Sequence, residues 1–228
     1  MNKRISVIVP TRNEETQLPD CLESVLSGQA DLELVVVDGA SEDNTLQVAR
    51  RYTGNIVALE RGDLSAQLNA GAAAATGDIL LFLHADSRLT PGLLSRLVEI
   101  PEDVVGGAFT MQLEGSRFFY RLLSYGGNLY CRLSGIYFGD RGIFARTSAF
   151  RKLGGFADLP IMADVDFSRR LRSLGKTVLL KGPVINSSRK FDRESPWRTL
   201  YLIVYALLAY RFKVDPEKIK EKYYSSRF

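Results

Sequence analysis

The stretch Gly77-Asp78-Ile79-Leu80-Leu81-Phe82-Leu83-His84-Ala85-Asp86-Ser87-Arg88-Leu89-Thr90-Pro91-Gly92 decides the fold class of this 228-residue chain. The five successive apolar residues at 79–83 are typical of a strand that is buried on both faces, as in a parallel sheet covered by helices. Thr90 and Pro91 then predict the start of a helix, as its N-cap and first-turn proline. The stretch therefore indicates an α/β protein with a polar loop after a central strand.

Two polar side chains begin that loop. His84 and Asp86 are two positions apart, so on a continuing strand they would point to the same side. In open α/β sheets, ligands bind where the strands end. A carboxylate there suits a divalent cation that carries a phosphate-containing substrate, because hard cations take oxygen ligands and share them with phosphates. The alternative is that Asp86 only caps or turns a loop.

Strands and helices alternate before this stretch. Apolar runs predict strands at 5–9, 32–37 and 56–59, with helices between them that end near Gly28, run through 46–49 and cover 65–75. Such alternation is typical of right-handed βαβ units and a parallel sheet. The segment has neither a G-x-G-x-x-G fingerprint nor a P-loop. Phosphates must therefore be held in another way, and a cation on Asp86 is one.

The second half is predicted to be more mixed. We expect helices at 93–98 and 147–153, an extended segment at 104–113, a helical stretch at 118–133 that Gly126 and Gly127 break, and a loop followed by a strand over 138–146. Asp164 opens a helix that ends at Gly175, and a strand follows at 178–180. Without a linker or repeat, the chain is expected to form one domain: a nucleotide-binding half at 1–92, an acceptor and catalytic half at 93–190, and C-terminal apolar and basic helices at 191–228.

Composition restricts the function classes. The net charge is only +4, but basic residues gather between Arg169 and Arg227, which fits a surface facing phosphate or an anionic membrane and also fits solvated helix faces. No zinc-finger, RRM or helix-turn-helix pattern is present, so nucleic acid is not an expected partner. Cys21 and Cys131 suggest buried thiols in a reducing compartment. The apolar run before Pro10 is too short for a signal peptide, so we expect a cytoplasmic protein.

Five motifs occur in order along the chain, at Ser6 to Glu15, Val35 to Thr45, Asn69 to Asp78, His84 to Asp86, and Gly154 to Phe167. Together they resemble family 2 glycosyltransferases of the GT-A fold, a nucleotide-binding αβα sandwich with a mostly parallel central sheet. The resemblance covers about the first 175 residues. It implies an inverting enzyme that uses a nucleotide-sugar donor and Mg²⁺ or Mn²⁺.

On the donor side, the resemblance implies that Pro10, Thr11 and Glu14 line the nucleotide pocket. Asp38 would accept a hydrogen bond from the base, and a uracil-like N–H suits a carboxylate. Asp86 corresponds to the second acid of the family's D-x-D motif and would coordinate the cation. His84 stands where the family has the first acid, which usually contacts the ribose. It would hydrogen-bond a hydroxyl, join the metal shell or have a structural role.

On the acceptor side, Asp164 corresponds to the family's catalytic base, although Ala163 replaces the first member of an acidic pair that is common there. A carboxylate at a helix N-terminus stays ionised, and the alternative for Asp164 is a plain N-cap. Two carboxylates on opposite sides of the anomeric carbon would give inversion. Arg141 and Arg189 are candidates for diphosphate contacts, because the guanidinium fork fits phosphate oxygens.

Two apolar segments remain. Residues 197–212 are shorter than the ~20 residues that span a bilayer, so they form a core helix, a homodimer interface or an interfacial anchor beside a lipid-linked acceptor. Packing or dimerisation is the favoured interpretation, with peripheral membrane contact the alternative. The aromatic segment at 117–125 would line an apolar acceptor or pack in the core.

The sequence thus predicts an inverting glycosyltransferase that moves a sugar from a UDP-sugar to an unidentified hydroxyl acceptor, with a lipid- or isoprenoid-linked acceptor as one option. One alternative is a non-catalytic sugar-nucleotide-binding protein, motivated by His84 and Ala163. The other is a sugar-1-phosphate nucleotidyltransferase, which would normally carry a glycine-rich loop after the first strand. Contact of the C-terminal segment with lipid would place the protein at the inner face of the cell membrane.

Overall fold

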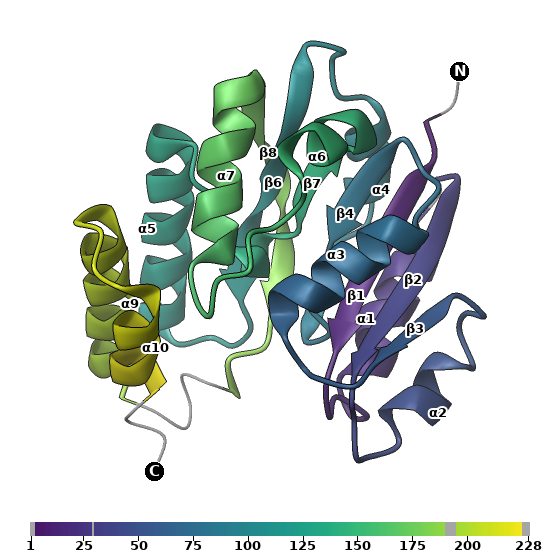
Figure 1. The fold of residues 1–228 in the computed structure, drawn as a ribbon, viewed down its shortest axis with the longest axis horizontal. Coiled ribbons are helices and arrows are strands. Elements are labelled where there is room, and N and C mark those ends of the chain that lie inside the picture. Colours follow the sequence, from purple (N-terminus) through teal and green to yellow (C-terminus); the bar gives the residue numbers. More distant parts are fainter. Residues whose placement is uncertain (1–2, 29, 190–194, 225–228) are drawn as a thin grey trace.

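The central feature of the molecule is a β-sheet (Figure 1). In the part of the chain that the structure describes, it has eight strands in the order β3-β2-β1-β4-β7-β6-β8-β5. The computed structural model describes residues 3–28, 30–189 and 195–224. Helices cover both faces, so the predicted αβα sandwich with a mostly parallel sheet is confirmed. The predicted boundary between residues 190 and 191, and the end of the basic run at Arg227, lie outside the described residues.

The amino-terminal half is built from parallel strands. These are β1 (Ile5–Thr11), β2 (Leu32–Gly39), β3 (Ile56–Leu59) and β4 (Ile79–Phe82). The intervening helices are α1 (Leu18–Leu26), α2 (Thr45–Ala49) and α3 (Leu64–Ala74). In the register of β1 and β2, Thr11 lies opposite Asp38, so the carboxyl ends of these strands meet at one edge.

The second half adds antiparallel neighbours. Its strands are β5 (Ser87–Leu89), β6 (Val104–Leu113), β7 (Ile143–Arg146) and β8 (Lys176–Asn186), of which β7 is antiparallel to both β4 and β6. Its helices are α4 (Leu93–Val98), α5 (Phe118–Ser134), the short 3₁₀ helix η1 (Gly139–Arg141), α6 (Thr147–Leu153) and α7 (Ala163–Leu174). β6 and β8 are parallel, and β5 pairs antiparallel with the end of β8.

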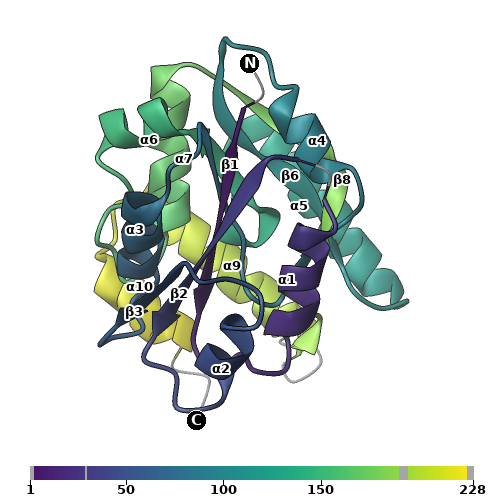
Figure 2. The same cartoon turned by 90° about the vertical axis from the view of Figure 1, so that its right-hand side faces the viewer.

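Figure 2 shows α1 and α4 on one side of the sheet and α3, α6 and α7 on the other. Most of the buried apolar residues form two clusters, one on each side. Successive strand residues alternate between the clusters: Val7 and Val9 pack toward α1, whereas Ile8 packs toward α3. A Cβ on Gly71 of α3 would collide with the Ile8 side chain. The small residues of α3 therefore allow the close packing on the sheet that the sequence predicts.

The polar loop that the sequence predicts after the central strand is a tight turn, so His84 and Asp86 do not lie on a continuing strand. β4 ends at Phe82, and a turn closed by a hydrogen bond from the Ser87 N–H to the His84 carbonyl (3.0 Å) leads into β5. The predicted N-cap at Thr90 is wrong, because α4 starts after Gly92, whose φ of +81° favours glycine. The Thr90 hydroxyl instead donates to the Pro183 carbonyl.

Three further boundaries differ from the prediction. Helix α5 runs uninterrupted through Gly126 and Gly127. β8 is much longer than the predicted 178–180. Helix α7 begins at Ala163 with Met162 as its N-cap, so Asp164 lies inside the first turn and is not the N-cap.

The chain continues with α9 (Pro196–Arg211) and α10 (Pro216–Tyr224), which pack against each other. Ala206 and Ala209 of α9 and Ile219 of α10 are buried together, beside Met162 at the start of α7. One face of α9 thus packs on the domain, as the favoured interpretation predicts. None of the helices in the described part of the chain combines the length and apolar character needed to cross a bilayer.

Candidate active site

The loops that follow β1 and β2 hold each other by hydrogen bonds from backbone N–H groups to short polar side chains. Asn13 N–H donates to Ser41 Oγ (3.0 Å), and Glu42 N–H donates back to Asn13 Oδ1 (2.8 Å). Glu14 N–H donates to Thr45 Oγ1 (2.8 Å). Asn13 has a φ of +56°, a left-handed conformation that asparagine tolerates. The two loops therefore form one wall at the carboxyl edge of the sheet.

Asp38 and Thr11 lie beneath this wall, each 2% exposed, and Pro10 is buried beside them. The Asp38 carboxylate accepts hydrogen bonds from the Ser41 N–H (3.0 Å), the Ser41 hydroxyl (2.5 Å) and the Thr11 hydroxyl (3.4 Å). In this conformation the carboxylate organises the loop after β2. Its contact with a nucleotide base stays a prediction, as does the contact of Pro10 and Thr11.

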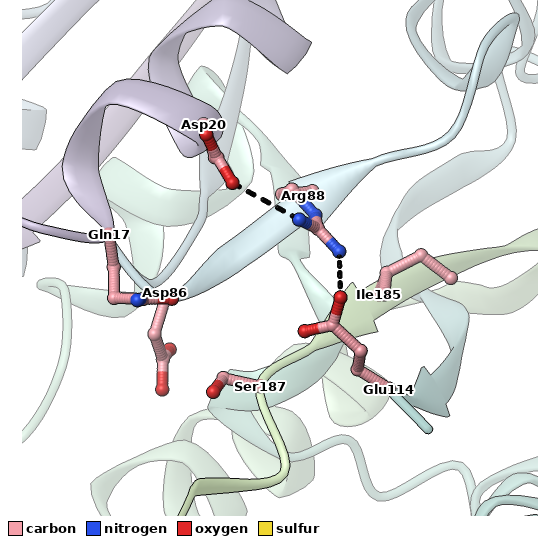
Figure 3. Close-up of a pocket in the computed structure, with 7 residues that line it drawn as sticks. All are labelled: Gln17, Asp20, Asp86, Arg88, Glu114, Ile185 and Ser187. Atoms are coloured by element: carbon pink, nitrogen blue, oxygen red, sulfur yellow. Dashed lines mark hydrogen bonds and ion pairs between the residues drawn. The ribbon is translucent and has the colours of Figure 1, made fainter. Parts of the chain in front are cut away.

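Asp86 lies in the turn between β4 and β5, where its side chain is half-buried. It lines a small pocket in which Arg88 lies between Asp20 (3.1 Å) and Glu114 (2.6 Å) (Figure 3). The Asp86 carbonyl accepts a hydrogen bond from the Ser187 N–H at the end of β8 (3.2 Å). Within the described residues, its carboxylate accepts no hydrogen bond and forms no ion pair. This carboxylate is therefore available to a ligand.

Glu14 and Arg189 form an ion pair at the same edge, with 3.1 Å between Glu14 Oε2 and Arg189 Nη2. Burial raises the pKa of the Glu14 carboxyl, the Arg189 guanidinium opposes this effect, and the negative charge of Asp86 adds to it. Glu14, Arg189 and Asp86 thus share one electrostatic environment. The structure brings these three predicted residues together.

His84 and Asp164 both lie against Gly139 of η1. A Cβ on Gly139 would lie 2.8 Å from His84 Nε2 and 3.8 Å from Asp164 Oδ2. The Gly139 N–H donates to Asp164 Oδ2 (2.8 Å), and the Val165 N–H donates to Asp164 Oδ1 (2.8 Å). Asp164, 80 residues from His84 in sequence, is therefore next to the loop that carries Asp86.

Burial raises the pKa of the Asp164 carboxyl above its ordinary value. The hydrogen bonds from Gly139 and Val165 oppose this rise, Asp140 adds to it through its negative charge, and His84 opposes it. A half-buried carboxylate with a raised pKa is a stronger proton acceptor than an exposed aspartate. The arrangement suits a general base.

Arg141 is only 3% exposed and is held inside the protein. Its guanidinium donates to Asn128 Oδ1 of α5, lies 3.8 Å from Asp140 Oδ1 and is over the Phe138 ring. Asn128 in turn bonds both the N–H and the carbonyl of Met111 in β6. A diphosphate contact by Arg141 stays a prediction. The burial of the Arg141 side chain makes such a contact less favourable.

The residues around Asp86 fit a divalent cation only in part. No group of three His, Cys, Asp or Glu side chains in the described ranges is arranged to hold a metal ion. An unpartnered carboxylate next to a basic residue does fit an ion that takes one protein oxygen and completes its shell with phosphate and water, as Mg²⁺ often does. The possible cation ligands in this region are carboxylate oxygens of Asp86 and Glu14, with His84 nearby.

Sequence reasoning missed the residue that links the two loops. Asn186, buried at the end of β8, accepts a hydrogen bond from the Ser87 hydroxyl (2.5 Å) and donates to the Asp140 carbonyl (2.7 Å). It thereby connects the Asp86 turn to η1, which carries Gly139. Only its place in the polar run at 186–189 hinted at such a role, since a lone asparagine is a weak signal.

Asn69 and Phe156 explain two motifs of the sequence. Phe156 N–H donates to Asn69 Oδ1 (2.9 Å), and Asn69 Nδ2 donates to the Phe156 carbonyl (2.9 Å). Gly155 precedes this pair with a φ of +80° and has no room for a side chain beside Asn69. The Asn69-Ala70-Gly71 and Gly154-Gly155-Phe156 motifs therefore fasten α3 to the segment that leads to α7.

Comparisons with known proteins agree on one family. The sequence profile described as Glycosyl transferase family 2 matches residues 6–154. A PGL/p-HBAD biosynthesis glycosyltransferase of Mycobacterium tuberculosis (strain H37Ra) is 32% identical over 184 residues, covering 72% of this chain and 68% of the relative. An uncharacterized glycosyltransferase of Nostoc sp. is 37% identical over 113 residues, covering 45% of this chain and 35% of the relative.

Solved structures show the same fold. The mannosyltransferase from Pyrobaculum calidifontis, in complex with GDP-Man and Mn²⁺, matches with a TM-score of 0.69 at 20% identity, over 98% of this chain and 70% of that one. S. aureus TarS 1-349, in complex with UDP-GlcNAc, matches with a TM-score of 0.66 at 20% identity, over 82% of this chain and 59% of that one. At these identities the likeness carries the fold alone.

Proposed function

The chain belongs to glycosyltransferase family 2 and has the GT-A fold, and from that premise we propose that it transfers a sugar, with inversion, from a UDP-sugar to a hydroxyl acceptor. The choice of UDP rests on Asp38, because a carboxylate suits the N–H donor of a uracil ring. Among the structural neighbours, one is in complex with UDP-GlcNAc and another with GDP-Man, so this fold accommodates both kinds of donor.

On the side of the leaving nucleoside diphosphate, Asp86 would hold Mg²⁺ or Mn²⁺. His84 and Glu14 lie at the same edge of the sheet as Asp86. The cation, when bound, neutralises charge on the diphosphate. Arg189 would release Glu14 and donate hydrogen bonds from its guanidinium N–H groups to the phosphate oxygens, because a partly exposed ion pair is weak and a charged phosphate is the stronger partner. Pro10 and Thr11 would support the nucleotide from beneath, and Arg141 would position η1.

On the acceptor side, Asp164 would take the proton of the acceptor hydroxyl. The freed oxygen forms a bond to the anomeric carbon from the face opposite the diphosphate, while the carbon–oxygen bond to the diphosphate breaks and its electron pair leaves with the nucleotide. The configuration at that carbon inverts. The raised pKa of Asp164 increases its capacity to accept the proton.

One observation carries this proposal: Asp164 and His84 contact the same glycine, and His84 is two residues before Asp86. Asp164, Asp86 and Arg189, the proposed base, cation ligand and phosphate contact, then belong to one edge of the sheet, where ligands bind in open α/β folds. A non-catalytic sugar-nucleotide-binding protein would not need a half-buried carboxylate with a raised pKa at that position.

The test separates binding from turnover. A panel of UDP- and GDP-sugars is screened for Mn²⁺-dependent thermal stabilisation of the wild type, and donor turnover is then measured for the wild type and for Asp164→Asn. We expect Asp164→Asn to keep the donor-induced stabilisation and to lose about 10²- to 10⁴-fold in kcat. Asp166→Asn, which changes a neighbouring acid that pairs with Arg170, is the matched control and should keep its turnover.

Two outcomes count against the proposal. A wild type that binds a donor but turns over nothing, with any acceptor offered, would be a binding protein. An Asp164→Asn variant with wild-type kcat would remove this residue from the chemistry. We further propose a cytoplasmic location, where nucleotide sugars are available; the homodimer and the lipid- or isoprenoid-linked acceptor stay predictions.

A further inference from the structure

Helices α5 and α9 each expose a regular row of large apolar side chains. In α5 the row has the spacing i, i+4, i+7, i+11 and i+15, and its members are 44–79% exposed. In α9 the spacing is the same and the members are 46–77% exposed. The α5 row is Phe118, Leu122, Tyr125, Leu129 and Leu133; the α9 row, which includes the residue just after the helix, is Trp197, Tyr201, Val204, Leu208 and Phe212.

The two helices that carry these rows lie beside each other. Figure 1 shows α5 and α9 beside each other at the edge far from β3, and the rings of Phe119 and Trp197 are in contact, with centroids 5.3 Å apart. Between the helices is an apolar cavity of about 300 Å³, lined by Tyr130 of α5 and by Val204 and Leu208 of α9. Val204 and Leu208 belong to the α9 row. We call this surface, made of the two rows, the α5–α9 face.

The charges of this face all have one sign. Neither α5 nor α9 contains an acidic residue. Exposed basic side chains lie along the rows and at their ends: Arg121, Arg132, Arg198, Arg211 and Lys213. Within the described ranges, none of these five forms an ion pair.

This charge pattern distinguishes the partners that an apolar face can have. A second copy related by a two-fold axis would place the same surface against itself, and the basic side chains of the two copies would face each other. A soluble protein normally covers or avoids an apolar surface of this extent. An anionic bilayer accepts the apolar side chains at the headgroup boundary and attracts the basic ones.

We propose that the α5–α9 face docks on an anionic lipid bilayer. The apolar rows enter the headgroup region, and the arginines and Lys213 contact lipid phosphates. The cavity of this face also includes Val165, the residue after Asp164, so docking holds the start of α7 close to the lipid surface.

The test is co-sedimentation with vesicles of phosphatidylcholine containing about 30% phosphatidylglycerol, against vesicles of phosphatidylcholine alone. It needs neither donor nor acceptor, so its result is independent of the transfer reaction. We expect the full chain to sediment with the anionic vesicles, and raising the salt from about 0.1 M to about 1 M to weaken this binding. Leu122→Glu and Leu208→Glu should each reduce binding about tenfold, since each removes apolar contact and adds a repelled charge.

The matched control is Leu26→Glu, because Leu26 is 46% exposed on α1, outside this face; it should bind as the wild type does. Arg121→Gln with Arg211→Gln touches no core residue, and weaker binding to anionic vesicles by this pair supports the proposal if a glutamate variant fails to fold. Equal binding of wild type and all variants would overturn the proposal. So would a wild-type dimer in sedimentation velocity that Leu122→Glu dissociates, with no vesicle binding, because the partner would then be a second copy.

Discussion

The backbone N–H of Gly139 donates a hydrogen bond to Oδ2 of Asp164 over 2.8 Å, and the His84 ring lies against the same glycine. A side chain at this position would displace the His84 ring, because a Cβ would lie 2.8 Å from His84 Nε2 and 3.2 Å from His84 Cε1. Gly139 thus sets the spacing between the loop of Asp86 and the helix of Asp164.

Gly139→Ala should therefore displace His84 and impair transfer. We expect kcat to fall about 10- to 100-fold, because a shift of about 1 Å in a reacting group has effects of this size. The free energy of unfolding should change by less than about 1 kcal/mol, because His84 is half-buried and can move. Steady-state kinetics and urea denaturation measure the two quantities. Gly54→Ala, where a Cβ meets no neighbour, is the control, and unchanged kcat in Gly139→Ala would contradict the expectation.

The pH dependence of kcat/KM should report Asp164. Because burial raises the pKa of this carboxyl, activity should fall with decreasing pH at a midpoint above the ordinary aspartate value. Asp140→Asn removes a negative charge that contributes to the rise, so it should move this midpoint to lower pH. A midpoint that does not move, or an activity that is flat through the acidic range, would show that Asp164 does not control the reaction.

The raised pKa of Asp164 also affects how stability depends on pH. The effect is opposite in direction to that of a salt-bridged aspartate, whose pKa is lowered by folding. The folded protein binds the Asp164 proton more tightly than the unfolded chain does. The contribution of this group to stability is therefore present below the unfolded pKa and is lost as the pH rises through the folded pKa. Urea denaturation of the wild type and of Asp164→Ala across this pH range measures this contribution. As the pH rises, the unfolding free energy of the wild type should fall relative to that of the variant.

Arg189→Ala should weaken donor binding more than it slows the chemical step. Loss of a charged hydrogen bond to phosphate predicts a rise of about tenfold in the donor KM. The unfolding free energy should change by less than about 1 kcal/mol, since the pair with Glu14 is partly exposed. Kinetics at varied donor concentration test this. Lys176→Ala breaks the exposed pair with Asp103 away from the site and should leave KM unchanged; an unchanged KM in Arg189→Ala would exclude the phosphate contact.

Gly126 and Gly127 of α5 should respond in opposite ways to alanine. At Gly126 a Cβ meets no neighbour, so Gly126→Ala should stabilise the protein by about 0.5–1 kcal/mol through helix propensity. At Gly127 a Cβ would collide with Nη2 of Arg141, whose guanidinium is bonded to Asn128. Gly127→Ala should therefore destabilise the protein. Chemical denaturation of the two variants measures the contrast, and stabilisation by both would show that Arg141 moves freely.

The pair of glycines also shows where a local pattern misleads. Two glycines in sequence predict a helix break by propensity, but Arg141 needs the space that Gly127 leaves, and the surrounding packing keeps α5 intact. The end of the strand before His84 likewise depends on a partner that is distant in the chain. The apolar run predicts a buried strand, and β4 ends at Phe82, which pairs with Ile143, the first residue of the antiparallel neighbour β7; no sequence pattern encodes that partner.

The sequence by itself determined the strand and helix pattern of the first half, the parallel sheet and the family, because apolar periodicity and short motifs act over a few residues. It also supplied Asp86 and Asp164 as candidates. Only the tertiary structure decided that these residues share one edge, since Asn186 and Gly139 join their loops through contacts between segments far apart in the chain. It likewise decided that Asp38 and Arg141 are buried and that the neighbouring helices α5 and α9 each expose an apolar row, because burial depends on which elements pack together.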